Sequence, residues 1–116
     1  MKPLIVTGVS GTQYKYFPLD INADWFEVPA NYMFGRLDVG GWFVAYIGQC
    51  NNARDRLPCH ERWAEAVKQH GVTYVLSHGA SADENVRLQE ERDLIQALAP
   101  PMNVQGQNAF RRGLFG

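Results

Sequence analysis

A glutamate interrupts an apolar helical stripe in the C-terminal third of the sequence. The stripe consists of Leu88, Ile95, Leu98 and Ala99, and Glu91 falls between its first two members. Removing a carboxylate from water costs several kcal/mol unless a cation or hydrogen bonds compensate it. Glu91 is therefore either an ion-paired acid at the edge of the core or a cleft residue that acts as a metal ligand or an acid/base group. Mg²⁺ suits the second interpretation, because it often takes one or two protein carboxylates and keeps several waters.

An arginine and a histidine occupy a comparable position in the middle of the chain. Arg56 and His60 are four residues apart, so on a roughly helical segment they share a side with Trp63. A histidine on an apolar face is commonly a hydrogen-bonded core residue, and an arginine commonly pairs with a nearby acid, here Asp55 or Glu61. The alternative is that both side chains border the same cleft as the glutamate.

Short apolar runs separated by turn residues fill the first fifty positions and predict two β-hairpins. The runs of the first hairpin are residues 4–9 and 14–17, and Pro18 is expected to end the second of them. The runs of the second hairpin are residues 31–34 and 42–48, of which the latter is apolar enough to be a central strand.

The pattern then becomes helical. We expect a short turn over residues 52–57 and a main helix from near Pro58, because proline is tolerated in the first turn of a helix but not in its interior. Gly71 is placed to end this helix, and residues 72–76 are mostly β-formers that predict a strand.

A second helix is predicted from a capping box at residues 81–84 to Ala99, just before Pro100. On this helix Glu90 and Asp93 are expected to point away from the apolar stripe and into solvent. An acid is inexpensive there, in contrast to the glutamate within the stripe.

These elements predict an α+β fold with a small central antiparallel or mixed sheet flanked by helices and an N-terminal β-hairpin. We expect one domain over residues 1–103, in which residues 1–29 are a hairpin extension and residues 30–103 form the core. Residues 104–116 are rich in Gly, Asn and Gln and are predicted to be a flexible tail.

The charges of the 116 residues nearly cancel, with 11 Lys and Arg against 12 Asp and Glu and a net charge of −1. This balance excludes a protein that coats nucleic acid or acidic membranes through a basic surface. It does not exclude an enzyme that concentrates positive charge in one cleft. No stretch approaches the ~18 apolar residues of a membrane span, and two cysteines are too few for a disulfide framework, so we expect a cytoplasmic protein.

Two short tyrosine motifs precede the arginine and the histidine. Residues 46–48 read Tyr-Ile-Gly, and residues 30–32 read Ala-Asn-Tyr, which places Tyr32 fourteen positions before Tyr46. Arg56 follows Tyr46 by ten positions and His60 follows by four more. This order and spacing resemble the GIY-YIG nuclease family, with a degenerate GIY element, a YIG element, a catalytic arginine and a histidine.

The resemblance continues in the second helix. Glu91 begins the string Glu-Arg-Asp-Leu-Ile, which is similar to the metal-binding glutamate of the family and the apolar pair that follows it. Pro100 and Asn103 match the closing element, where Asn103 would brace the site. The resemblance covers roughly residues 30–103, which would be the catalytic core, and is closest to small stand-alone bacterial members. The catalytic domain of the excision-repair incision nuclease is related to these.

The resemblance implies hydrolysis of DNA phosphodiester bonds with a single divalent cation, Mg²⁺ or Mn²⁺. Under it, Glu91 would hold the metal at the scissile phosphate, and Arg56 would clamp the phosphate and the charge that develops on it. Tyr32 would activate the attacking water, directly or through a chain, with Tyr46 and His60 helping to orient it.

Three functions remain open: a DNA nuclease of repair, restriction or mobile-element processing, a non-catalytic nucleic-acid or protein-binding module, and a hydrolase of another phosphodiester such as RNA. Residues 51–70 carry 4 basic and 3 acidic groups and residues 101–116 carry 2 and 0, whereas residues 71–100 carry 2 and 5. Because affinity grows with the phosphates neutralised, a nuclease with this charge would be weak and salt-sensitive. Its expected partners are DNA, branched and damaged DNA included, and an accessory protein or a second copy that helps to hold it.

Overall fold

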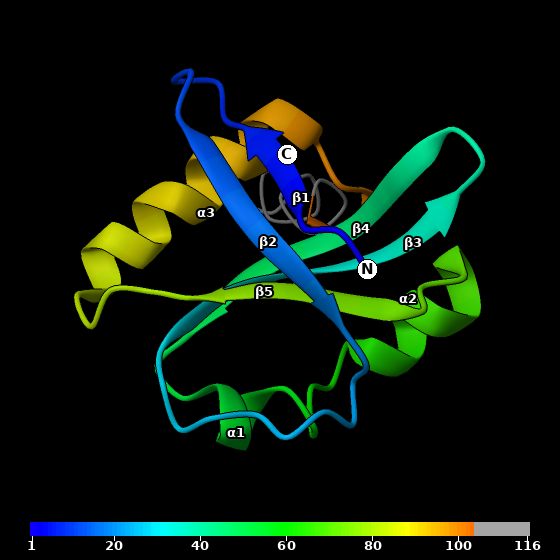
Figure 1. Cartoon of the computed structure of the whole chain (residues 1–116), viewed down its shortest axis with the longest axis horizontal. Coiled ribbons are helices and arrows are strands. Elements are labelled where there is room, and N and C mark those ends of the chain that lie inside the picture. Colours follow the sequence, from blue (N-terminus) through cyan, green and yellow to red (C-terminus); the bar gives the residue numbers. More distant parts are fainter. Residues whose placement is uncertain (104–116) are drawn as a thin grey trace, which may run out of the picture.

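Five strands form one antiparallel sheet in the order β1-β2-β5-β3-β4 (Figure 1). The computed structural model describes residues 1–103, so the predicted tail of residues 104–116 lies outside the described residues. The strands are β1 (Leu4–Thr7), β2 (Gln13–Leu19), β3 (Ala30–Asp38), β4 (Gly41–Cys50) and β5 (Tyr74–Gly79), and the helices are α1 (Ala53–Arg56), α2 (Trp63–His70) and α3 (Glu84–Leu98). The predicted α+β class is confirmed. None of the described helices combines the length and the apolar content needed to cross a membrane.

The helices cover both faces of the sheet (Figure 1). On the face of α1 and α2, Tyr32 and Phe34 of β3 pack in an apolar cluster with Ala66 of α2. On the face of α3, Met33 of β3 packs with Leu94 of that helix. Side chains alternate along a strand, so β3 supplies both cores. β3 is paired on both sides, whereas β1 and β4 are the edge strands, so the expectation that residues 42–48 form a central strand is wrong.

Both predicted hairpins are present, but their strands run further than the apolar runs indicated. β2 continues through Pro18, where we expected it to end, and reaches Leu19. Its pairing with β1 stops at Tyr16, so that beyond this point β5 is its one partner. A strand edge tolerates a residue without an N–H group, which explains why the strand survives the proline.

The main helix of the middle segment begins at Trp63 and not near Pro58, so this part of the prediction is wrong. Pro58 has no N–H group to donate to an earlier carbonyl. The chain turns here instead, with His60 N donating to Leu57 O at 3.3 Å and Trp63 N donating to His60 O at 3.1 Å. His60 therefore lies in a loop between two helices and not on one continuous helix with Arg56.

The start of α3 also differs from the predicted capping box. Asp83 is the N-cap and its side chain accepts from Asn85 N at 2.9 Å, whereas Ser81 Oγ accepts from Asp83 N outside the helix. The two predicted helix ends are confirmed. α2 ends at Gly71 with φ of 64° and α3 ends at Ala99 with φ of 46°.

The buried side of α3 is rotated relative to the predicted stripe. Leu94 and Ile95 are buried, whereas Leu98 is exposed. Asp93, which we expected in solvent, is buried, and Glu90 is half-buried. The expectation failed because Tyr14 and Tyr16 of β2, and Ser10 in the turn before it, donate hydrogen bonds to these two acids. Helical spacing alone does not reveal donors on another element.

Asp93 joins the N-terminal hairpin to α3. Its carboxylate accepts from Ser10 N at 2.9 Å, from Ser10 Oγ at 2.7 Å and from Tyr14 Oη at 2.8 Å. The bonds from Ser10 hold the pKa of Asp93 below its usual value. One helical turn earlier, Glu90 accepts from Tyr16 Oη at 2.5 Å. The hairpin is therefore attached to the helix through two carboxylates.

The substitution Gly8→Ala is expected to destabilise the protein, because a Cβ atom at this position would overlap the Asp93 carboxylate. We expect a loss of about 1–3 kcal/mol in the free energy of unfolding, measured by urea denaturation. The matched control is Gly40→Ala, whose Cβ would meet nothing within 4 Å and which should change stability by no more than about 0.5 kcal/mol. Equal stability of the two variants would contradict the anchoring role of Asp93.

Candidate active site

His60 lies at the centre of a group of aromatic rings. Its ring centroid is 4.8 Å from that of Phe34, 5.4 Å from that of Tyr46 and 5.5 Å from that of Tyr32, in edge-to-face arrangements. Only 5% of His60 is exposed. Burial, with the nearby Arg56 charge, lowers the pKa of His60 to about 4, so the imidazole is neutral at physiological pH.

The hydrogen bonds of His60 determine which of its nitrogens carries the proton. Arg62 N lies 3.1 Å from His60 Nδ1 and donates to it, so Nδ1 is the acceptor. In a neutral imidazole the other nitrogen then carries the proton. His60 Nε2 lies 2.7 Å from Tyr32 Oη, and the assigned tautomer makes Tyr32 the acceptor of this bond.

Tyr32 of β3 can lie over β4 because the YIG element ends in glycine. Tyr32 of β3 is directly opposite Gly48 of β4, and a Cβ atom on Gly48 would lie 2.6 Å from Tyr32 Oη. Tyr32 is only 1% exposed, and burial raises its pKa above the usual value. Tyr32 is therefore a deeply placed, protonated phenol in the absence of substrate.

Tyr46 and Glu91 form the more accessible side of the group. Tyr46 is half-buried, and burial together with the Glu91 charge raises its pKa. Glu91 is also half-buried, and burial raises its pKa despite the neighbouring Arg92. Within residues 1–103 the Glu91 carboxylate has neither an ion-pair partner nor a hydrogen-bond donor, so the explanation of an ion-paired acid at the core's edge is not what the structure has.

Arg56 is paired with an acid. Its Nη1 and Nη2 lie 2.5 and 2.9 Å from the two carboxylate oxygens of Glu61, an end-on bidentate pair. The side chains are 38% and 65% exposed, respectively. Glu61 is thus the acidic partner that the sequence analysis gave as the alternative to a catalytic role for Arg56.

A polar cleft of about 360 Å³ opens beside Arg56. Its lining residues are Gln49, Cys50, Asn51, Asn52, Asp55, Arg56, Glu84 and Arg87. It extends from the C-terminal end of β4 across α1 to the first turn of α3. The cleft is lined largely by amide and charged side chains, which suits an extended polar chain better than an apolar ligand.

Asn103 is bound to the middle of the YIG element. Its Oδ1 accepts from Ile47 N at 2.7 Å and its Nδ2 donates to Ile47 O at 2.9 Å. The amide therefore pairs with the outer edge of β4 as a neighbouring strand would. This contact holds the residue next to Tyr46 in place, as expected of a bracing asparagine.

Tyr32, Tyr46 and His60 come together in the structure, with Glu91 beside them and Asn103 behind them. Arg56 is close enough for its charge to act on His60. Arg62 is not among the site residues predicted from the sequence, and its guanidinium carbon is 5.3 Å from the centroid of the Tyr46 ring. Its position two residues after the histidine is visible in the sequence, but its contact with β4 depends on the turn after Pro58.

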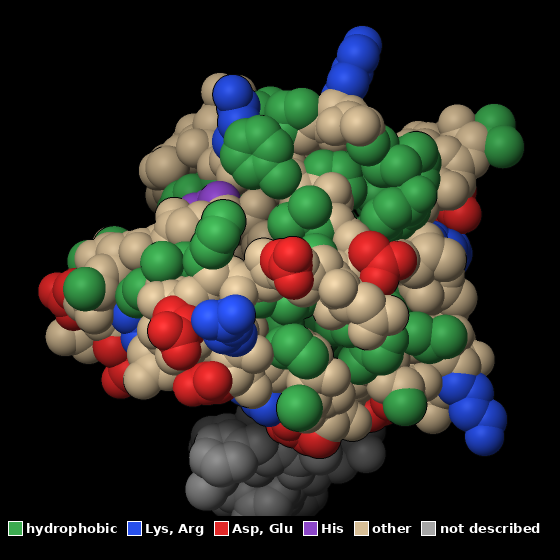
Figure 2. Space-filling model, turned by 60° about the horizontal axis from the view of Figure 1, so that its bottom comes forward, with side chains coloured by type: hydrophobic (Ala, Val, Ile, Leu, Met, Phe, Trp, Pro, Cys, Tyr) green, Lys and Arg blue, Asp and Glu red, His purple; other side chains and the backbone are tan. Residues whose placement is uncertain are grey.

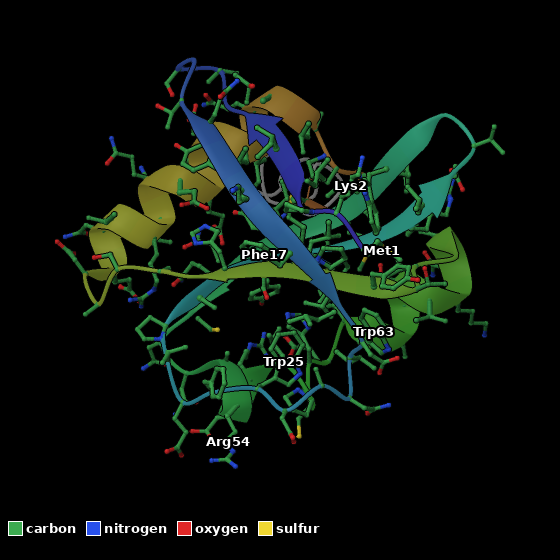
Figure 3. All side chains as sticks on the ribbon, in the orientation of Figure 1. Met1, Lys2, Phe17, Trp25, Arg54 and Trp63 are labelled. Carbon is green, nitrogen blue, oxygen red and sulfur yellow. The ribbon has the colours of Figure 1, made fainter. Side chains whose placement is uncertain are left out.

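Basic side chains form no continuous patch on the face shown in Figure 2, where hydrophobic side chains are prominent and Lys and Arg stand singly. Arg54, on α1, points away from the sheet at the lower edge of the molecule (Figure 3). The cations nearest the candidate site are Arg56 and Arg62, each paired with a glutamate, and Arg87, which lines the same polar cleft as Arg56.

The substitution Glu91→Gln is expected to raise the melting temperature of the metal-free protein by a few degrees at pH 7. The folded state raises the pKa of Glu91, so its contribution to stability is lost as pH rises from the unfolded value of about 4.5 through the folded pKa. The gain should therefore be present at pH 7 and absent near pH 4. Thermal unfolding in EDTA at both pH values measures it, and an equal effect at both would contradict the burial of an unpartnered charge.

The chain matches no protein-family model, and it has no significant match among curated proteins or solved structures. The candidate site is therefore defined by its own geometry. That geometry joins a buried tyrosine–histidine pair, a half-exposed tyrosine, a half-buried carboxylate and a surface arginine.

Proposed function

We propose that this protein is a metal-dependent endonuclease of the GIY-YIG type that hydrolyses DNA phosphodiester bonds with a single divalent cation. The observation that carries the proposal is the grouping of Tyr32, Tyr46 and His60 in one aromatic cluster, with the Glu91 charge close enough to act on Tyr46. A core that serves only stability gains nothing from a half-buried carboxylate without a partner. A site that binds a cation does.

Glu91 is suited to a hard divalent cation such as Mg²⁺ or Mn²⁺. Mg²⁺ usually keeps several waters and needs only one or two carboxylates. Within the described residues no three His, Cys, Asp or Glu side chains gather as a ligand set, and a single carboxylate agrees with this mode of binding. When bound, the metal would supply positive charge for the phosphate and for the leaving 3′-oxygen.

To act as a base, Tyr32 must first release its own proton to solvent. His60 Nε2–H donates to Tyr32 Oη, and a hydrogen bond to the charged form favours the resulting phenolate, which can then take a proton from the attacking water and return to the phenol. Tyr32 is closed to solvent, so direct contact with water is less consistent with this geometry than transfer through a chain. Tyr46 is the half-exposed neighbour, with its ring centroid 6.4 Å from that of Tyr32, and would hold the water.

Arg56 would have to exchange its partner when DNA binds. The two oxygens of Glu61 occupy the same pair of N–H donors that a phosphate takes. A surface ion pair of this kind is worth only about 0.2–1 kcal/mol. A backbone phosphate can therefore displace Glu61, and Glu61 is a built-in competitor of the substrate.

Cleavage of plasmid and branched DNA with Mg²⁺ or Mn²⁺ tests the proposal. Glu91→Ala should lose activity by on the order of 100-fold or more, because it removes the metal's ligand. Glu27→Ala is the control, since it removes the same charge from an exposed loop residue. Equal activity of wild type and Glu91→Ala would contradict the assignment of Glu91 as the metal ligand of a nuclease.

The same assay separates the other candidate functions. Salt-sensitive DNA binding without cleavage in either metal would identify a binding module that keeps the arrangement of the site. Faster cleavage of a matched RNA would identify a ribonuclease. The RNA is included because no residue of the described site distinguishes the two substrates by the 2′-hydroxyl group.

The substitution Glu61→Gln is expected to strengthen DNA binding at low salt by up to about fivefold, because it removes the carboxylate that competes for Arg56. The stability of the protein should change little, since the pair lies on the surface. Glu27→Gln is the matched control: it removes an equal charge from an exposed loop residue that does not line the cleft beside Arg56 and has no ion pair in residues 1–103. Fluorescence anisotropy with labelled DNA measures both variants, and equal gains would assign the effect to net charge.

A further inference from the structure

Arg62 connects three parts of the candidate site. Its guanidinium carbon is 5.3 Å from the centroid of the Tyr46 ring, in a cation–π contact. Its backbone N–H donates to His60 Nδ1 at 3.1 Å and thereby fixes the tautomer of the histidine. Its Nη1 donates to Met102 O at 3.2 Å, next to the asparagine that braces β4. Arg62 itself belongs to none of the motifs noted in the sequence.

The Arg62 guanidinium is bound by Glu65 along its Nε–Nη2 side, and each terminal nitrogen keeps one N–H without a partner in the described residues. Nε donates to Glu65 Oε1 at 3.3 Å and Nη2 donates to Glu65 Oε2 at 3.0 Å, while Nη1 uses one of its hydrogens for Met102 O. A guanidinium has five N–H groups. One N–H on each terminal nitrogen therefore has no partner among the residues that the structure describes. The side chain is 30% exposed, so a ligand in solvent can reach it.

The two arginines of the site differ in which donors are occupied. Glu61 covers the end of the Arg56 fork, whereas Glu65 takes the side of the Arg62 fork and leaves its end open. Two parallel N–H groups at the end of a guanidinium match two oxygens of a phosphate. Glu65 and the Met102 carbonyl orient Arg62 beforehand, so less conformational entropy is lost when it binds an anion.

We propose that Arg62 binds a second backbone phosphate of the nucleic acid, next to the phosphate that Arg56 would hold. This inference rests on the proposed function for its substrate class, a phosphodiester chain. The charges of Arg62 and Arg56 both act on Tyr46 and His60, so the chain would cross the site within reach of two guanidinium groups. Contacts to phosphate carry no sequence information, and Arg62 therefore contributes affinity without base preference.

The salt dependence of DNA binding tests the inference without requiring cleavage. Binding of a labelled duplex is measured in EDTA over a series of NaCl concentrations for wild type, Arg62→Gln, Arg62→Lys and Arg54→Gln. Loss of one phosphate contact should make the slope of log K against log salt shallower by about 0.9 in Arg62→Gln. Arg54→Gln removes the same charge from an exposed position of α1 that points away from the sheet, and it should keep the wild-type slope (Figure 3).

Arg62→Lys keeps the charge but not the fork, so it should keep the slope and bind more weakly than wild type. This variant decides the question if Arg62→Gln does not fold, as judged by circular dichroism. A wild-type slope in Arg62→Gln, an equal reduction in Arg54→Gln, or wild-type affinity in Arg62→Lys overturns the inference while leaving the nuclease proposal intact. No DNA binding by wild type overturns both. The predicted slopes without cleavage in Mg²⁺ support Arg62 and reject the nuclease.

Discussion

The candidate site depends on a single neutral histidine that is hydrogen-bonded on both sides. His60 accepts from Arg62 N through Nδ1 and donates to Tyr32 Oη through Nε2. The first bond is made by the backbone turn that Pro58 forces on the chain. The second requires the Tyr32 phenol to lie buried over Gly48 of β4. A charged imidazole would have to give up its acceptor role toward Arg62 N, and burial among Phe34 and the tyrosines opposes that charge.

β4 is an edge strand, so the backbone of the YIG element needs a hydrogen-bond partner on its outer side. β4 has β3 on one side, and on the other side its backbone near the YIG element is paired by the Asn103 amide. An asparagine satisfies the Ile47 N–H and C=O groups over a single residue and leaves the neighbouring positions open. The bracing contact of Asn103 thus follows from the unpaired outer edge of β4.

The sequence predicted the class of fold, both hairpins and the ends of two helices, because these follow from apolar period, Gly71 and the Pro100-Pro101 pair. It misplaced the start of α2 at Pro58 and assigned Asp93 to solvent. The two errors have different physical origins. Local pattern does not show which donors another element will supply, as Ser10 and Tyr14 do for Asp93. The start of α2 is displaced because Pro58 has no N–H group and the chain turns there. The site residues could be proposed from their order along the chain, whereas the role of Arg62 required the fold.

A net charge near zero is a poor guide to anion binding here, because what matters is which N–H groups remain unoccupied. Arg56 and Arg62 each have a glutamate partner, so these two pairs add no net charge to the site. The geometry separates them, since Glu61 faces the end of one fork and Glu65 the side of the other. Glu61 therefore occupies a donor on each terminal nitrogen of Arg56, whereas Glu65 leaves one N–H on each terminal nitrogen of Arg62 available. A chain can be neutral overall and still orient a cation toward a phosphate, provided that its acids hold the cation from the side.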